Sequence, residues 1–168
     1  MDEAEPVFEA APMRTAERRV PADWIDYNGH MNVAYYTMAF DRALDEVYDR
    51  LGIGPALVES HGMGPMALQT QIHYLGELLE GTRFACAVRL LDADAKRVHV
   101  FGEMLNLDAG GAVAATYESL TMNVDLRSRR SAPFPEEAAG RVRAALAAHA
   151  GLARPVQVGA PLGIRRRG

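Results

Sequence analysis

The sequence predicts an α+β fold in which an antiparallel sheet carries one long helix on a face. Apolar residues recur at steps of three and four over 33–51, which is the period of a helix with one buried side. Four longer strand-like segments joined by short turns follow, and the first of them alternates in residue type over 66–74. A long helix followed by consecutive strands is typical of a sheet packed against that helix.

Length and composition are those of one globular domain. The 168 residues suffice to bury a core, and 49% of them are apolar. A net charge of −4 with a pI near 5.7 argues against nucleic-acid binding. The chain has no apolar run long enough to span a membrane, and its acidic first residues do not resemble a secretory signal. We therefore expect a cytoplasmic protein that binds no membrane.

Disulfide and metal chemistry are not expected. Cys86 is the single cysteine, which excludes an intrachain disulfide and a cysteine-based zinc site. It lies in an apolar strand pattern, and we interpret it as a core thiol. The five histidines lack metal-ligand spacing, so we predict no metal.

Three regions are expected along the chain. Residues 1–13 are acidic and lack periodicity, which predicts a flexible tail. The domain is predicted over 14–150 and opens with a short strand at 15–20. Residues 151–168 are predicted to form an irregular C-terminal tail, which ends in three arginines.

The helix over 33–51 has clear start and stop signals. Asn32 is a suitable N-cap and Gly52 a suitable residue after the last turn. Four glycines and two prolines over 52–65 then predict a loop, with a short helical turn near 56–60.

Four strands and a second helix complete the domain. In the first strand, Gln69, Gln71 and His73 share one side. Pro135 suits the first position of a helix that runs to about residue 150. The four strands are predicted at 66–74, 82–91, 97–106 and 112–126, with turns at 92–96 and 108–111.

The seven residues from Asp26 to Asn32, directly ahead of the long helix, form the most informative motif. A carboxylate at a helix N-terminus can act on water or on a carbonyl group. Asp26 can therefore serve as a nucleophile or a general base, or it can simply cap a turn. Asn28 can orient water or the substrate carbonyl, or it can be a turn residue.

The backbone of this motif is a candidate for stabilising an oxyanion. Gly29 lets the main chain approach a ligand closely, although it can equally serve a turn. The N–H groups of Gly29, His30 and Met31 lie near the positive end of the helix and are candidate oxyanion donors.

These residues resemble the motif of the hotdog-fold acyl-CoA thioesterases of the 4-hydroxybenzoyl-CoA thioesterase type. The resemblance covers about 15–150, and the later segments 71–75, 79–82 and 114–124 agree with it. The residues that carry it are Asp26, Gly29, His30, Asn32 and Tyr36, with Phe40 in the helix that follows.

The resemblance implies a strongly curved antiparallel sheet wrapped around the helix at 33–51. It also implies a homodimer, or a homotetramer built from dimers, with active sites at the subunit interface. Asp26 matches the catalytic aspartate of the family. His30 is more often architectural in this pattern than a proton-transfer group. The reaction is hydrolysis of an acyl-CoA, so CoA is part of the substrate and no cofactor is expected.

Several further residues are candidates for substrate binding. Trp24 and Tyr27 flank the acid and are predicted to wall an acyl pocket, whereas Tyr36 has the helical spacing of either a core or a pocket residue. His73 can reach the pocket across the interface. The variant Trp-Ile-Asp-Tyr-Asn-Gly-His-Met resembles thioesterase modules associated with carnitine breakdown, which suggests betainyl-CoA as the acyl-CoA.

Two questions stay open at this point. Arg127 and Arg129 follow the last strand and can pair with CoA phosphates, or they can form a solvated basic turn. A non-hydrolytic acyl-CoA binding or regulatory protein is the alternative function. The intact Asp26 argues against it, because a pure binder needs no carboxylate beside the carbonyl.

Overall fold

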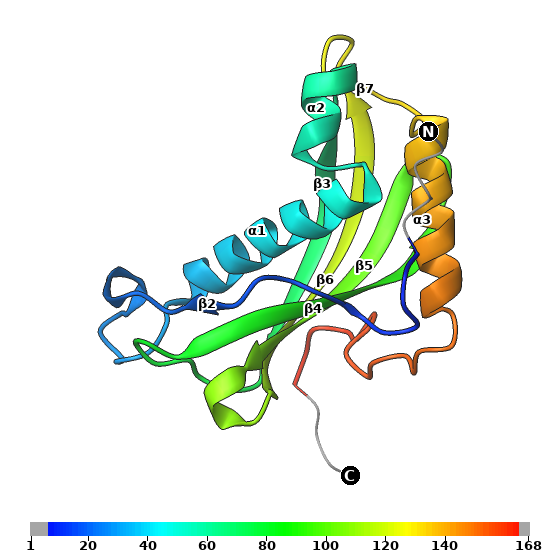
Figure 1. Ribbon diagram of the computed structural model, residues 1–168. Coiled ribbons are helices and arrows are strands. Elements are labelled where there is room, and N and C mark those ends of the chain that lie inside the picture. The colour runs from blue at the N-terminus through cyan, green and yellow to red at the C-terminus, as the bar shows by residue number, and fades with distance from the viewer. Residues whose placement is uncertain (1–6, 165–168) are drawn as a thin grey trace.

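In the computed structural model, which describes residues 7–164, one long helix lies across a curved antiparallel sheet (Figure 1). The helix is α1 (Val33–Leu51). The sheet has seven strands in the order β1-β4-β5-β6-β3, with β2 paired to β4 and β7 paired to β6. The strands are β1 (Met13–Arg14), β2 (Arg18–Arg19), β3 (Met63–Tyr74), β4 (Arg83–Ala93), β5 (Arg97–Asn106), β6 (Ala112–Asp125) and β7 (Arg130–Ser131).

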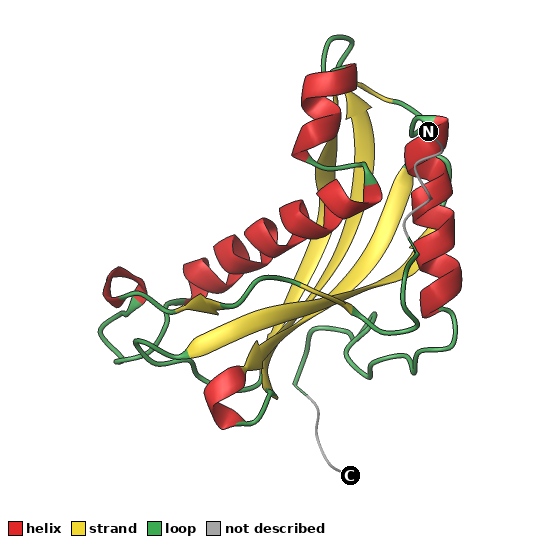
Figure 2. Cartoon of the chain, in the orientation of Figure 1, coloured by secondary structure: helices red, strands yellow, loops and turns green. Residues whose placement is uncertain are grey.

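Two shorter helices flank the sheet (Figure 2). Helix α2 (Pro55–His61) follows α1, and α3 (Glu136–His149) packs against β4. Single 3-10 turns occur at Ala22–Trp24 and Leu107–Ala109. None of the helices in the described range is long and apolar enough to cross a membrane.

The predicted long helix is confirmed with its bounds and caps. The Asn32 side chain accepts a hydrogen bond from the Ala34 amide at 3.0 Å, and Gly52 ends the helix with a φ of 74°. This left-handed conformation favours glycine because a Cβ atom would be strained there. The second helix and the three strands after the first are confirmed within three residues at each end.

Two local predictions, for the segments before and after α1, are confirmed only in part. The strand expected at 15–20 is reduced to β2, because the Ala16 amide donates to the Glu46 carboxylate at 3.0 Å and not to a strand. The short helical turn expected near 56–60 is confirmed as the seven-residue helix α2, with Pro55 in its first turn, but the loop expected to run to residue 65 ends earlier because β3 already begins at Met63.

The alternation predicted along β3 is interrupted by a bulge. The antiparallel register shifts by one residue between Ala67 and Gln69. Because successive residues alternate faces, the extra residue Leu68 places Met66 and Thr70 on opposite faces of the sheet. Strict alternation would have placed them on the same face.

Parts of both predicted tails belong to the fold. Residues 1–6 of the predicted N-terminal tail lie outside the described residues, but Met13 forms β1 and is buried, and Phe8 packs against the core. The C-terminal segment over 151–164 is irregular, as predicted, whereas the rest of the predicted tail, 165–168 with its three arginines, lies outside the described residues. The segment over 151–164 nevertheless packs on the outer face of the sheet, opposite α1, where Gln71 Nε2 donates to the Ala160 carbonyl at 2.6 Å.

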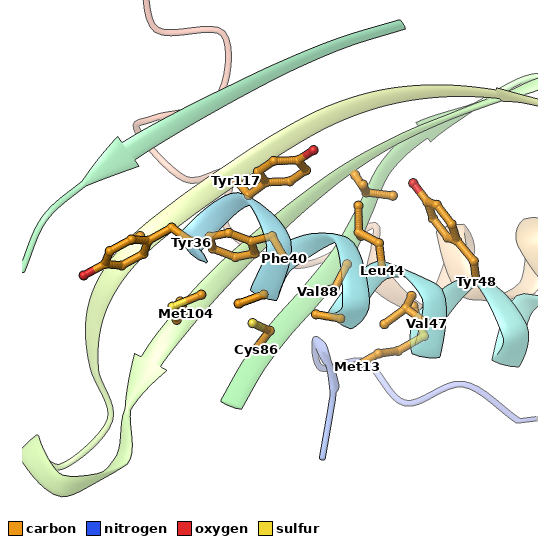
Figure 3. Close-up of a cluster of buried hydrophobic side chains, with 14 of the residues drawn as sticks. Met13, Tyr36, Phe40, Leu44, Val47, Tyr48, Cys86, Val88, Met104 and Tyr117 are labelled. Carbon is orange, nitrogen blue, oxygen red and sulfur yellow. The ribbon is translucent and has the colours of Figure 1, made fainter. Parts of the chain in front are cut away.

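The core lies between α1 and the inner face of the sheet (Figure 3). The Phe40 ring stacks on Tyr117 with centroids 5.1 Å apart, and Gly102 leaves room for it because a Cβ there would lie 3.4 Å from that ring. Each large side chain buried in this way contributes about 1.5–3 kcal/mol. Cys86 is also buried, and this burial raises the pKa of its thiol to about 12, which confirms the prediction of an unreactive core thiol.

Tyr36 belongs to this core and connects α1 to the loop between β3 and β4. Its side chain is 3% exposed, and burial raises the pKa of its hydroxyl, which therefore stays protonated. The hydroxyl accepts from the Leu78 amide at 3.2 Å and donates to the Gly76 carbonyl at 3.4 Å. The prediction that Tyr36 binds substrate is therefore replaced by a structural role within the subunit.

Tyr36→Phe should lower the free energy of unfolding by about 1–3 kcal/mol, because it leaves the buried Leu78 amide without an acceptor. Urea unfolding measures this difference. Tyr35→Phe is the matched control on the same helical turn, since the Tyr35 hydroxyl has no hydrogen bond to any described residue. Equal stability of the two variants would contradict this role of Tyr36.

Candidate active site

The segment from Ile25 to Met31 folds into a closed turn in front of α1. Ile25 and Met31 form an isolated antiparallel bridge, and the Asp26 amide donates to the His30 carbonyl at 3.1 Å. The Gly29 amide donates to the Asp26 carbonyl at 2.9 Å, and Gly29 has a φ of 80°. A Cβ at Gly29 would contact nothing within 4 Å, so the turn requires glycine for its backbone conformation and not for space.

The Asp26 carboxylate is held by two donors from its own motif. Oδ1 accepts from the Asn28 amide at 2.8 Å, and Oδ2 accepts from Asn32 Nδ2 at 3.1 Å. Asp26 is only partly buried, and each carboxylate oxygen has further acceptor capacity. The group is therefore fixed in direction and still accessible to water or a substrate. Sequence reasoning identified Asn32 as the helix cap but missed this second contact.

Only one of the three proposed oxyanion donors is available within the subunit. The Gly29 amide is used by Asp26, and the Met31 amide donates to the Leu78 carbonyl at 2.8 Å. The prediction is therefore corrected for these two groups. The His30 amide has no acceptor among the described residues, so of these three groups it is the one that stays free.

The His30 side chain has a contact that suits an architectural role. Its Nδ1 lies 3.2 Å from the Met31 carbonyl, and the side chain is half-buried. A ring protonated at Nδ1 donates to the Met31 carbonyl. It thereby stabilises the backbone of Met31, whose amide donates to the Leu78 carbonyl. The Asn28 side chain is exposed and has no hydrogen bond to any described residue.

The two aromatic residues that flank Asp26 have different environments. Trp24 is buried, and its ring stacks on Tyr35 with centroids 5.2 Å apart. The Arg42 guanidinium lies 6.0 Å from the same ring. Trp24 is therefore a core residue and not the wall of a pocket in this subunit. Tyr27 is 95% exposed and is the aromatic ring of the motif that stays free.

The two arginines proposed for CoA phosphates are not near Asp26 in the same subunit. Arg127 and Arg129 lie in the turn between β6 and β7, beside α2 at the C-terminal end of α1 (Figure 1). A helix of 19 residues is roughly 28 Å long, and Asp26 precedes its other end. Within one subunit, Arg127 and Arg129 therefore lie far from the Asp26 carboxylate.

His73 is also separated from Asp26 in the subunit. Its neighbour Tyr74 packs edge-on against Tyr36 on the α1 side, with centroids 5.3 Å apart. Because residues alternate along a strand, His73 lies on the outer face, where its Nε2 is 3.3 Å from Gln71 Nε2.

A hollow of about 320 Å³ lies on that outer face, beneath the C-terminal segment. His99 Nε2 and Glu118 Oε1 are 2.7 Å apart on its floor, and Glu118 Oε2 accepts from the Gly159 amide at 2.7 Å. These polar atoms bind one another and fix the C-terminal segment. The described residues contain no group of three or more His, Cys, Asp or Glu side chains that could hold a metal ion.

A protein family and proteins named as thioesterases match most of the chain. The thioesterase-like superfamily matches residues 20–146. The betainyl-CoA thioesterase of Pseudomonas aeruginosa is 34% identical over 152 residues, which are 90% of this chain and 95% of that protein. The L-carnitine dehydrogenase/betainyl-CoA thioesterase of Rhizobium meliloti is 32% identical over 157 residues. The match covers 94% of this chain but only 31% of that longer protein.

Solved structures agree with the fold described above. A Staphylococcus aureus protein solved in complex with CoA is similar with a TM-score of 0.84 and 26% identity, over 92% of this chain and 98% of that chain. A candidate thioesterase from Pseudomonas putida KT2440 is similar with a TM-score of 0.79 and 30% identity, over the same shares. These likenesses confirm the hotdog fold. Together with the match over residues 20–146, they show that the chain belongs to the thioesterase-like superfamily.

Proposed function

We propose that this protein is an acyl-CoA thioesterase and that its substrate is betainyl-CoA, which it hydrolyses to betaine and free CoA. The observation that carries the proposal is the Asp26 carboxylate, which is held by two donors, remains accessible and lies beside the start of α1. The names of the relatives in Pseudomonas aeruginosa and Rhizobium meliloti support the acyl group.

The chemistry requires attack on the thioester carbon and departure of the CoA thiolate. Asp26 either attacks the carbon itself, or it takes a proton from the water that attacks. The charge that develops on the carbonyl oxygen is stabilised by the His30 amide and the positive end of α1. The C–S bond then breaks. On the general-base route the departing sulfur takes up the proton that Asp26 took from water. On the nucleophilic route CoA leaves as the thiolate and the acyl group stays on Asp26 as a mixed anhydride; water hydrolyses this anhydride to betaine, which frees Asp26 and releases the proton that the thiolate takes up. Asn28 is proposed to orient the attacking water.

Water is the only co-reactant in this scheme, so we propose neither a cofactor nor a metal. A cytoplasmic location stays a prediction, and the single buried Cys86 is compatible with a reducing compartment.

Asp26→Asn should lower the rate of thiol release from betainyl-CoA by about a hundredfold or more, because the amide is neither a base nor a nucleophile. Thermal unfolding should be little changed, since the Asn oxygen can still accept from Asn28. A thiol-reactive dye measures turnover across betainyl, short straight-chain and aromatic acyl-CoAs.

Full activity of Asp26→Asn would contradict the mechanism. Tight binding of acyl-CoAs without thiol release by the wild-type protein would instead favour the non-hydrolytic alternative. Digestion after a rapid quench separates the two routes: an acyl group on the peptide that contains Asp26 identifies a nucleophile, and an unmodified peptide identifies a general base.

Tyr27 is the candidate group for recognising the cationic acyl chain. Its exposed ring directly follows Asp26 in the chain. A quaternary ammonium over an aromatic face is stabilised by about 0.5–2 kcal/mol. A neutral acyl chain of the same shape gains no such term, so the ring can provide selectivity for charge.

Tyr27→Leu should reduce the preference for betainyl-CoA over its neutral isostere, 3,3-dimethylbutanoyl-CoA, by about 2- to 30-fold. The ratio of kcat/KM for the two substrates measures the effect. Tyr27→Phe keeps the aromatic face and serves as the control. An equal loss of kcat/KM with both substrates would show that Tyr27 does not distinguish the charged acyl chain from the neutral one.

We also propose that the protein is a homodimer joined through β3. This strand lies at one end of the sheet order and spans twelve residues, so its outer edge has no partner strand within the described chain. Apolar side chains along and just beyond it are exposed, namely Met66, Leu68, Tyr74 and Leu75. Pairing with a second copy would satisfy the edge. The outer face is covered by the C-terminal segment, which favours a dimer over a tetramer stacked through that face.

Light scattering coupled to size exclusion should give a mass about twice that of the 18.3 kDa chain. Leu68→Lys should shift the protein toward the monomer, because a charge on the edge strand opposes pairing. Leu162→Lys is the matched control, since Leu162 is fully exposed on the C-terminal segment. A monomeric wild-type protein, or a Leu68→Lys variant that stays dimeric, would contradict this interface.

A further inference from the structure

We infer that Asn32 is a positioning residue that aims the Asp26 carboxylate and fixes it to the start of α1. The inference rests on the proposed hydrolysis at Asp26. Both ends of the Asn32 amide are used: Oδ1 accepts from the Ala34 amide at 3.0 Å, and Nδ2 donates to Asp26 Oδ2 at 3.1 Å. One planar group therefore caps the helix and orients the carboxylate.

The chemistry of the two partners fixes the direction of this amide. A backbone N–H can only donate and an ionised carboxylate can only accept, so the oxygen must face Ala34 and the nitrogen must face Asp26. The reversed amide would place oxygen against carboxylate oxygen and N–H against N–H. The orientation is thus determined by two opposed contacts.

Of the two residues that donate to the Asp26 carboxylate, Asn32 is held more rigidly. Its own amide donates to the Trp24 carbonyl at 2.8 Å, and its carbonyl accepts from the Tyr35 amide at 3.0 Å. Trp24 is buried, and α1 is packed along the sheet. The other group, the Asn28 amide, lies in the middle of the turn, where residues 27–29 are exposed. The start of the helix therefore fixes the position of Asp26 Oδ2, whereas the exposed part of the turn fixes that of Oδ1.

Few residues can perform both tasks at this position. Asn, Asp and Ser are about equally good helix caps. Asp lacks a donor for Asp26 and adds a second negative charge beside it. Ser retains a cap oxygen but is too short to place a donor where Nδ2 lies. Asn32→Ser and Asn32→Asp therefore retain the cap and remove the contact to Asp26.

The test compares stability and kinetics in the full-length chain. Asn106 provides a matched control, because its side-chain oxygen caps the turn Leu107–Ala109 through the amides of Asp108 and Ala109, at 3.1 Å each. We expect Asn32→Ser to lower the melting temperature no more than Asn106→Ser does. We expect kcat for betainyl-CoA to fall about 10- to 100-fold in Asn32→Ser alone, with KM changed less than twofold.

The pH profile gives a readout that a purely structural role would not change. In Asn32→Asp two carboxylates adjoin and share a proton, so the pH of half-maximal kcat should rise by about one unit or more. Wild-type kcat in Asn32→Ser, a parallel loss of kcat and melting temperature, or an unshifted profile in Asn32→Asp would each overturn the inference.

A spectroscopic measurement separates this inference from the proposed function. The side-chain NH₂ signals of Asn32 in a ¹H–¹⁵N spectrum should shift with pH in the wild type and stay constant in Asp26→Asn. If this coupling is present but no acyl-CoA is hydrolysed, the proposed function fails and the contact stands. If hydrolysis occurs without the coupling, the inference about Asn32 fails.

Discussion

The burial of one side of α1 against the curved sheet determines where every functional group lies. Phe40 stacks on Tyr117 above the space left by Gly102, so the helix cannot shift along the sheet without losing these contacts. Its first turn is fixed to the β3–β4 loop through the Tyr36 hydroxyl, and the segment just ahead of it through the Met31 amide. The start of the helix, and with it the candidate carboxylate, is therefore held by the core and not by the exposed turn.

The site combines a rigid element with an exposed one. The helix start provides the fixed Asn32 amide and the unpaired His30 amide, whereas Tyr27 belongs to the exposed turn. Rigid placement suits the group that must meet the reacting carbon, because small displacements are costly for catalysis. An exposed aromatic ring suits recognition of the acyl chain. The outer edge of β3 has no partner strand among residues 7–164, and it is the surface through which the proposed second subunit would enclose both.

The sequence allowed α1 and the acidic motif to be predicted because both depend on local signals. The helical period, the Asn32 cap and Gly52 lie within a few residues of what they determine. The pairing of the Met31 amide with Leu78 could not be predicted, because it depends on a loop that returns from 47 residues further along the chain. The remote position of Arg127 depends likewise on the course of β6 along the sheet. Burial of Trp24 by Tyr35 is a packing result that no local pattern encodes.

A carboxylate at position 26, oriented by an amide at the helix cap, is the group that we propose performs the hydrolysis. Exchanging the two groups in the double variant Asp26→Asn/Asn32→Asp tests this proposal most directly, because one carboxylate and one amide are retained at adjacent sites. We expect this variant to have a near wild-type melting temperature, since Asp is also a good cap, and to release thiol from betainyl-CoA about a hundredfold or more slowly. Thiol release at the wild-type rate from this exchanged variant would contradict the proposed role of Asp26.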